Sequence, residues 1–180
     1  MLEKIEIATE RFLLRTLTES AVTEKYLNWL GNADARKFIT AAASINDLED
    51  LRAYVRQRIG REDILFLGIF EKDTGLHIGN IKFEPVNPEL GYAIMGMLIG
   101  DSDYRGKGVT AEVLRASARW LRQYRNIKQI ALGVSKDNPA AIRAYEKVGF
   151  VISKTEFISN HPSTMVWNLA NVGDSVTGKD

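Results

Sequence analysis

An apolar stretch that runs into a glycine-rich, basic turn constrains this 180-residue chain more than any other feature. Residues 97–110 read Met-Leu-Ile-Gly-Asp-Ser-Asp-Tyr-Arg-Gly-Lys-Gly-Val-Thr, and a helical pattern follows. Gly106 and Gly108 lack the Cβ atoms that would keep a ligand away from the backbone, so the N–H groups at the start of the helix can converge on an anion. The stretch predicts a diphosphate cradle, to which Arg105 and Lys107 add positive charge.

Two common phosphate-binding motifs do not fit this turn. A Walker A loop has the pattern Gly-x-x-x-x-Gly-Lys-Ser/Thr, but five residues separate Gly100 from Gly106, and Gly108 stands where the hydroxyl is needed. A dinucleotide fingerprint requires a third glycine three residues after the second, and that position is Ala111. Both motifs are excluded, so the cradle belongs to another pattern.

The composition favours one globular domain that acts on small molecules or peptides. The hydrophobic content of 45% is enough for one core, which we expect over residues 3–170, with a polar tail at 171–180. A net charge of +1 predicts neither a nucleic-acid partner nor an acidic membrane surface. The chain has no cysteine and two histidines, which argues against a disulfide, a thiol nucleophile or a zinc site. No signal peptide or membrane-spanning run is evident, which predicts a cytoplasmic protein.

Hydrophobic periodicity predicts alternating strands and helices. The first helix follows Thr18 and ends at Gly31, a capping box at residues 44–47 begins the second, and Pro85 lies in a rigid loop between two strands. The strand after the cradle helix should be parallel to the strand before it, because a helix crosses between them. Strands are expected at 11–15, 64–70, 77–83, 90–99, 129–134, 151–158 and 163–169, and later helices at 109–124 and 139–148.

Two motifs in this order resemble the GNAT superfamily of acetyl-CoA-dependent N-acetyltransferases. The pyrophosphate loop of that family reads Arg-x-x-Gly-x-Gly/Ala, and Arg105, Gly108 and Thr110 occupy its defined positions. Thr110 departs from Gly/Ala, which implies a wider turn or a hydroxyl aimed at the phosphate. Residues 138–150 match a second motif, Asn-x-x-Ala-x-x-x-Tyr-x-x-x-Gly-Phe, and the resemblance covers residues 5–169.

The resemblance implies an α/β (α+β) GNAT fold: a mixed, mostly antiparallel sheet of six to seven strands with helices on both faces. It implies acetyl-CoA as co-substrate, no metal, and direct transfer to an amine, since no cysteine is present to carry an acyl group. The backbone of Leu98 or Ile99 should pair with the pantetheine arm and polarise the thioester. The remaining coenzyme contacts expected are Arg105, Gly106, Lys107, Gly108, Val109, Thr110 and Asn138.

The resemblance also suggests the catalytic groups. Tyr145 corresponds to the general acid of the family, and its ordinary pKa of about 10 keeps the phenol protonated at neutral pH. The base is less defined, because the strand at 90–99 has no acid in its interior. Glu84 is the first choice, with Glu89, Asp101 and His77 as alternatives. Asn138 has a second interpretation as a simple helix cap before Pro139.

The acceptor is predicted from a local resemblance to the branch that contains amino-sugar and ribosomal-protein N-terminal acetyltransferases. Tyr26 and Trp29 lie on the helix that shapes the acceptor pocket in these enzymes, although their helical spacing is also typical of core residues, and Lys82 or Arg52 could meet a phosphate. A nucleotide-linked amino sugar is the preferred acceptor, and a protein N-terminus is the alternative. A non-catalytic acyl-CoA-binding protein is the rival from another class. The sequence does not determine the oligomeric state, and a homodimer is compatible with it.

Overall fold

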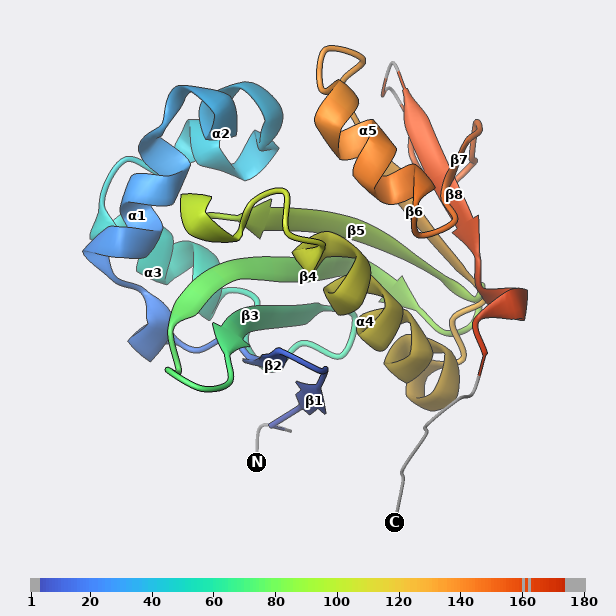
Figure 1. Ribbon diagram of the computed structural model, residues 1–180, viewed down its shortest axis with the longest axis horizontal. Coiled ribbons are helices and arrows are strands. Elements are labelled where there is room, and N and C mark those ends of the chain that lie inside the picture. The colour runs from blue at the N-terminus through green and yellow to red at the C-terminus, as the bar shows by residue number, and fades with distance from the viewer. Residues whose placement is uncertain (1–3, 160, 162, 174–180) are drawn as a thin grey trace.

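The computed structural model describes residues 4–159, 161 and 163–173, and the predicted tail therefore lies mostly outside the described residues. One sheet of eight strands has the order β1-β2-β3-β4-β5-β6-β8-β7 (Figure 1). Only β5 and β6 pair in parallel among these neighbours, as predicted. The elements are β1 (Glu6–Ala8), β2 (Phe12–Thr16), α1 (Glu24–Gly31), α2 (Ala33–Phe38), α3 (Leu48–Arg56), β3 (Leu65–Glu71), β4 (His77–Asn87), β5 (Tyr92–Ile99), α4 (Val109–Arg125), β6 (Gln129–Gly133), α5 (Pro139–Glu146), β7 (Val151–Ile152) and β8 (Thr164–Asn168).

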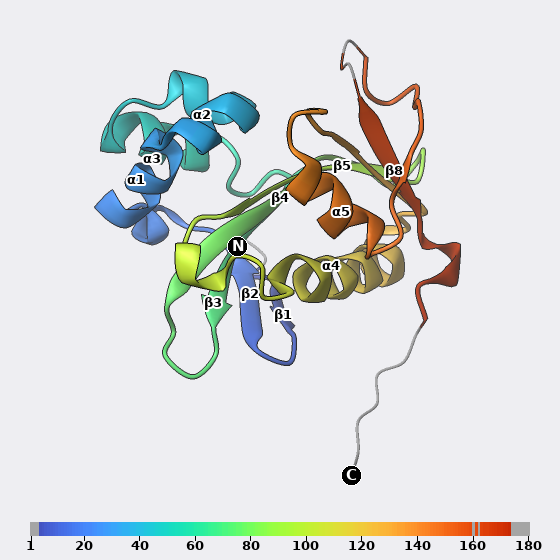
Figure 2. The same ribbon diagram turned by 45° about the horizontal axis from the view of Figure 1, so that its top comes forward.

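Helices cover both faces of the sheet, which confirms the predicted fold class. Leu65, Leu67 and Ile69 of β3 pack in the hydrophobic cluster that contains α4, whereas the intervening Phe66 packs against the cluster built by α1 and α3. This alternation is expected, because successive side chains of a strand point to opposite faces. Figures 1 and 2 show α4 lying along the sheet and α1, α2 and α3 gathered at one end.

The sheet has eight strands rather than the six to seven predicted. The additional strand β1 has only three residues, with Ile7 buried between two exposed neighbours, so its alternation is too short to stand out in the sequence. At the other edge, β7 ends at Ile152 and does not continue to 158 as predicted. The chain leaves the sheet there, and Phe157 stacks on Tyr92 with ring centroids 3.8 Å apart.

Strand β4 passes through the predicted loop at 85–88 and ends at Asn87. The register with β5 shifts between Phe83 and Val86, so a bulge absorbs the extra residue around Pro85. Such a bulge is compatible with proline, because a bulged residue need not donate to the ladder. Residues 80–84 therefore lie on one continuous strand.

Two predicted helix starts are wrong by several residues. Thr18 precedes only a short 3₁₀ turn, and α1 begins at Glu24 after Thr23, whose side chain accepts from the Tyr26 N–H. Helix α3 begins after Asp47, which accepts from the Asp50 N–H, rather than after Ser44. In both cases the cap is a residue further along the chain than predicted. Ser, Thr and Asp are all favoured at the cap position, so the sequence alone does not distinguish the candidates.

The feature that positions the site is an opening between β5 and β6. Their pairing covers only Tyr92 to Ile94 on β5 and Gln129 to Ala131 on β6, although β5 continues to Ile99 and β6 to Gly133. Beyond Ile94 the two strands separate, and β5 remains paired to β4 alone. Backbone groups on that edge of β5 are therefore available to a ligand.

Candidate active site

The predicted cradle has the backbone that its glycines require. Gly106 and Gly108 have φ angles of 71° and 76°, a region that residues with side chains rarely adopt. Gly108 is the N-cap of α4, a helix of 17 residues, and no side chain caps it. The first N–H groups of an α-helix have no partner within the helix, so those after Gly108 can bind an anion. Val109 is buried and anchors this end of the helix.

Neighbouring side chains hold the cradle in place. The Arg105 Nε–H donates to the Ile99 carbonyl at 3.1 Å, so its guanidinium joins the turn to the end of β5. Arg11 donates to the Lys107 carbonyl at 3.0 Å and forms an ion pair of 2.7 Å with Glu112. Lys107 itself is exposed and Thr110 is half-buried. The cradle is therefore tied to both β5 and the β1–β2 turn.

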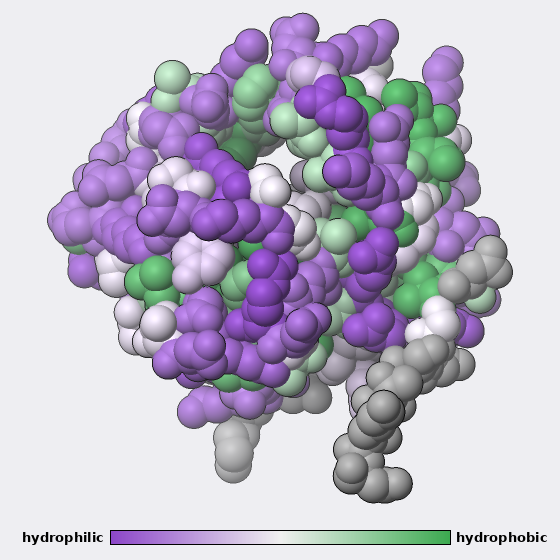
Figure 3. All heavy atoms as spheres, in the orientation of Figure 1, coloured by the Kyte–Doolittle hydropathy of each residue, from purple (hydrophilic) through white to green (hydrophobic). Residues whose placement is uncertain are grey.

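A cavity of about 380 Å³ opens where β5 and β6 separate. Its lining comes from both sides of the opening, with α1, α3, β3 and β4 on one side and β6 and α5 on the other. Figure 3 shows the surface hollowed between the α1–α2 region and α5. The predicted site residues that line the cavity are Tyr26, Lys82, Glu84, Leu98 and Tyr145.

Tyr145 lies in the cavity wall on α5, where its ring packs against Phe150 with centroids 5.7 Å apart. Burial raises the pKa of Tyr145 to about 12. The phenol is therefore fully protonated at neutral pH and holds a proton at Oη. A group in this state has a proton to donate, and the role of Tyr145 as general acid stays a prediction.

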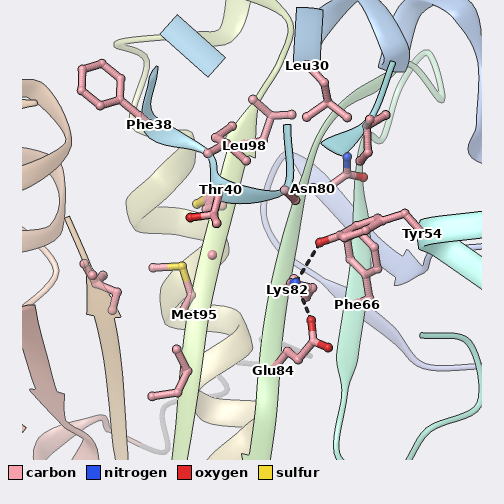
Figure 4. Close-up of a pocket in the computed structure, with 18 of the residues that line it drawn as sticks. Leu30, Phe38, Thr40, Tyr54, Phe66, Asn80, Lys82, Glu84, Met95 and Leu98 are labelled. Atoms are coloured by element: carbon pink, nitrogen blue, oxygen red, sulfur yellow. Dashed lines mark hydrogen bonds and ion pairs between the residues drawn. The ribbon is translucent and has the colours of Figure 1, made fainter. Parts of the chain in front are cut away.

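Three polar side chains form a row along β4: Asn80, Lys82 and Glu84. Their i, i+2, i+4 spacing places them on one face of the strand, and all three line the cavity (Figure 4). Lys82 Nζ donates to Tyr54 Oη at 2.8 Å and to Glu84 at 2.5 Å. Arg58 adds a second ion pair to Glu84 at 2.9 Å.

These contacts weaken Glu84 as a base. Burial alone would raise the pKa of Glu84, but the hydrogen bonds from Lys82 and Arg58 outweigh it, and the pKa lies below its ordinary value. A carboxylate held by two cations is ionised at neutral pH and takes up a proton less readily. Of the alternative bases, Asp101 pairs with Lys25 at 2.9 Å, and neither Asp101, Glu89 nor His77 is among the cavity-lining residues.

The aromatic residues predicted for acceptor binding lie in different places. Tyr26 lines the cavity but is only 3% exposed. Trp29 is outside the cavity lining: its indole packs on Gly100, where a Cβ atom would lie 1.9 Å from Trp29 Cδ2. His77 touches both rings, with centroids 5.8 Å from Tyr26 and 5.0 Å from Trp29. Trp29 therefore joins α1 to the end of β5.

Asn138 caps α5, as one of its two interpretations predicts. Its Oδ1 accepts from the Ala141 N–H at 3.2 Å. Neither Asn138 nor the cradle at 105–110 is among the cavity-lining residues, and Leu98 rather than Ile99 faces the cavity. Apart from Asn138, the residues predicted to contact the coenzyme lie at the start of α4 and at the end of β5. The cavity lies beside β5.

The sequence interpretation gave no role to four polar residues of the cavity, Thr40, Tyr54, Asn80 and His161. Asn80 was detectable, because it stands two residues before Lys82 on the same strand face. Tyr54 comes from α3, and His161 covers Gly133 with its imidazole, Cδ2 lying 2.6 Å from where a Cβ would be. The last two are brought to the cavity by tertiary packing, which has no local signal.

Comparison with known proteins identifies the class of enzyme. Residues 11–151 match the family described as "Acetyltransferase (GNAT) domain". Mycothiol acetyltransferase of Corynebacterium glutamicum (strain R) is 30% identical over 97 residues, which are 53% of this chain and 30% of that protein. The chain thus spans less than a third of the length of that curated relative.

Solved structures of low sequence identity have the same fold. The spermidine N-acetyltransferase of Vibrio cholerae, in complex with CoA and spermine, has a TM-score of 0.76 at 18% identity and covers 90% of this chain and 98% of its own. The aminoglycoside acetyltransferase AAC(6')-Ib, with paromomycin and acetyl-CoA, has a TM-score of 0.73 at 21% identity, with 92% and 100% covered.

The family match over residues 11–151 defines the class of this protein, and the solved structures share its fold. This chain belongs to the GNAT acetyltransferase family. Within residues 4–159, 161 and 163–173, no group of three or more His, Cys, Asp or Glu side chains is placed to hold a metal ion. In the same part of the chain, no helix is long and apolar enough to cross a membrane.

Proposed function

We propose that this protein transfers the acetyl group of acetyl-CoA directly to a primary amine. The observation that carries the proposal is the opening between β5 and β6, which leaves an edge of β5 unpaired beside a cavity that Tyr145 lines. The residues fit the coenzyme, because the turn has room beside both glycines: no atom lies within 4 Å of the position that a Cβ would take at Gly106, and at Gly108 the nearest atom is Nη2 of the cationic Arg11, at 3.8 Å. Acetyl-CoA would supply the activated thioester.

Different groups of this chain bind the coenzyme, orient its thioester and donate the proton. The N–H groups at the start of α4 bind the diphosphate, with Arg105 and Lys107 nearby. The free edge of β5 at Leu98 and Ile99 orients the extended arm and its carbonyl. Tyr145 holds a proton at Oη and donates it to the departing sulfur. Asn138 can contribute a coenzyme contact through the side-chain nitrogen that its capping role leaves over.

The amine must lose a proton, and Glu84 remains our predicted acceptor of it. It is the only carboxylate among the described residues that line the cavity. Because its pKa is lowered, we propose that Glu84 takes the proton through an ordered water, or takes it directly after its ion pair with Lys82 has loosened. Replacing Glu84 by Gln should therefore slow turnover most at the acidic end of the pH–rate profile, where the free amine is scarcest.

The charges around the cavity favour an acceptor that is not a polycation. Glu84 is already neutralised by Lys82 and Arg58, so no unpaired carboxylate lines the described cavity to attract a second ammonium group. Lys82 can instead exchange part of its contact with Glu84 for a phosphate. We propose a nucleotide-linked amino sugar as the acceptor, with a protein N-terminus as the alternative, in a single cytoplasmic domain over residues 3–170.

The test is a thiol-release assay with acetyl-CoA, which has a clean baseline because the protein has no cysteine. A nucleotide-linked amino sugar, an N-terminal peptide and spermidine are compared by kcat/KM. The proposal expects the sugar to exceed spermidine by at least about tenfold. Peptides ahead of the sugar by about a hundredfold, or about 2.7 kcal/mol, would favour N-terminal acetylation. Coenzyme binding without turnover on any amine would indicate a non-catalytic acyl-CoA-binding protein.

A further inference from the structure

Asn80 has a buried hydrogen-bond donor that the protein leaves unused. The residue lies in the middle of β4 and is 4% exposed. Its Nδ2 has no hydrogen-bond partner among the described residues. A buried donor without a partner costs about 1–3 kcal/mol, and most buried polar groups in proteins avoid this. Asn80 lines the proposed acceptor cavity, which is the place where a partner can arrive.

The orientation of the Asn80 amide is set by His77. Its Oδ1 lies 2.9 Å from His77 Nε2. Burial lowers the pKa of His77 and outweighs the opposing hydrogen bond to Asn80, so the ring is neutral at neutral pH. Because the amide oxygen Oδ1 can only accept, this contact requires the proton on Nε2, and Nδ2 is then the end of the amide that His77 does not occupy. Phe70 stacks on the imidazole with centroids 4.8 Å apart, which restricts the ring.

The neighbours of Asn80 place this donor close to the reacting groups. Asn80 is directly opposite Leu98 in the β4–β5 register, so both side chains lie on the face that α1 and α3 cover. Leu98 is on the edge that we propose for the acyl donor, and Lys82 follows on the same face (Figure 4). An acceptor atom that reaches Nδ2 therefore lies beside Leu98 and, with the acyl donor on that edge, near the reacting nitrogen.

We propose that Asn80 determines acceptor specificity by donating a hydrogen bond from Nδ2 to an oxygen on the carbon next to the amine. The substrate class is then a 1,2-amino alcohol or an α-amino carbonyl compound, which includes 2-amino sugars and peptide N-termini and excludes simple polyamines. His77 is a positioning residue that holds the amide. This inference rests on the proposed acetyl transfer to an amine, but not on the nucleotide-linked sugar.

The experiment compares trans-2-aminocyclohexanol with cyclohexylamine, two amines that differ by the neighbouring hydroxyl. The selectivity, defined as the ratio of their kcat/KM values, is measured for the parent, Asn80→Asp and Asn80→Leu. Asn80→Asp keeps the shape and the contact to His77 but removes the donor, and Asn80→Leu does so without adding charge. Asn87→Asp is the control on the same strand, because its side-chain oxygen accepts from the Leu90 N–H and an aspartate can do the same.

The parent and the control should prefer the amino alcohol by about ten- to a hundredfold, since unpaired polar groups in a site penalise analogues that lack the matching atom. Both Asn80 variants should lose most of that preference. The ratio does not depend on how much of a variant is folded, so partial destabilisation cannot produce the result. An unchanged ratio, or equal losses on both amines, overturns the inference. Absence of thiol release by the parent on every amine would instead refute the proposed acetyl transfer.

Discussion

The predicted cradle and the acceptor cavity are built from different ranges of the chain. The cradle lies within residues 99–112, and its conformation follows from two glycines at positive φ and the start of a long helix. The cavity takes side chains from α1, α3, α5 and four strands. Its polar row on β4 ends at Glu84, which pairs with Arg58 from a distant part of the chain. Local backbone chemistry specifies the first, and long-range packing specifies the second.

Because of this difference, the side chains of the two regions can vary to different extents. A diphosphate is recognised by backbone N–H groups, which every sequence with the right turn supplies. The acceptor, in our proposal, is recognised by side chains such as Asn80, Lys82 and Tyr54, which come from different elements. Structures of similar fold at about 20% identity act on different amines, as the names spermidine N-acetyltransferase and aminoglycoside acetyltransferase state. The following predictions test the division, starting from the largest effect.

Tyr145→Phe should have the largest effect, because it removes the proposed proton donor from the cavity wall. We expect kcat to fall by about ten- to a thousandfold, while coenzyme affinity changes little. Tyr124→Phe is the matched control, since Tyr124 is 62% exposed on α4. The assignment fails if kcat is unchanged and single-turnover rates show that chemistry limits the reaction.

Gly108→Val should weaken acetyl-CoA binding by about a hundredfold or more, or about 2.7 kcal/mol, because the new side chain would occupy the anion's side of the turn. Gly75→Val is the matched control: Gly75 has a φ of 70° in the β3–β4 turn, and no atom lies within 4 Å of the position that a Cβ would take there. Both variants bear similar backbone strain. Calorimetry should show a loss of affinity for Gly108→Val alone, and equal affinities would reject the cradle.

The same contrast explains how much the sequence could predict. Helix α4 was predicted at 109–124 and found at Val109–Arg125, and α5 began at Pro139 as predicted, because caps and glycines are local signals. The strand β1 and the bulge at Pro85 were missed, and the strand predicted at 151–158 ends at Ile152, since each of these features depends on a partner strand. Trp29 is the clearest example. Its helical spacing with other apolar residues predicts that it is buried, but does not predict that its indole packs on Gly100.

Gly100→Ala tests the join between the two regions. An added Cβ would lie 1.9 Å from the Trp29 ring, a distance that forces α1 away from the end of β5. Overpacking of this kind typically costs about 1–3 kcal/mol. Gly31→Ala, in α1, is the control, because nothing lies within 4 Å of its Cβ position. Thermal unfolding should show a lower Tm for Gly100→Ala only, and similar Tm values for the two variants would show that the contact is unimportant.

The smallest effect concerns Glu112, which ties the cradle helix to the β1–β2 turn. Its carboxylate accepts from Thr9 Oγ1 at 2.6 Å and from the Arg11 backbone and side chain at 2.7 Å each. Burial alone would raise the pKa of Glu112, but these bonds outweigh it and the pKa lies below its ordinary value. Stabilisation from a carboxylate with a lowered folded-state pKa is present above the unfolded pKa and is lost as pH falls through the folded one.

Glu112→Gln should therefore lower the free energy of unfolding by about 1–2 kcal/mol at pH 7, and the difference from the parent should shrink as the pH falls below the ordinary carboxyl pKa. Glu49→Gln is the control, because Glu49 is 68% exposed and its ion pairs with Arg52 and Arg56 are long, at 3.8 and 3.7 Å. Denaturant unfolding at several pH values measures both. A pH-independent difference would mean that Glu112 acts by packing rather than charge, and the cradle would then be held by its glycines, by Arg105 and by the contact of Arg11 with the Lys107 carbonyl.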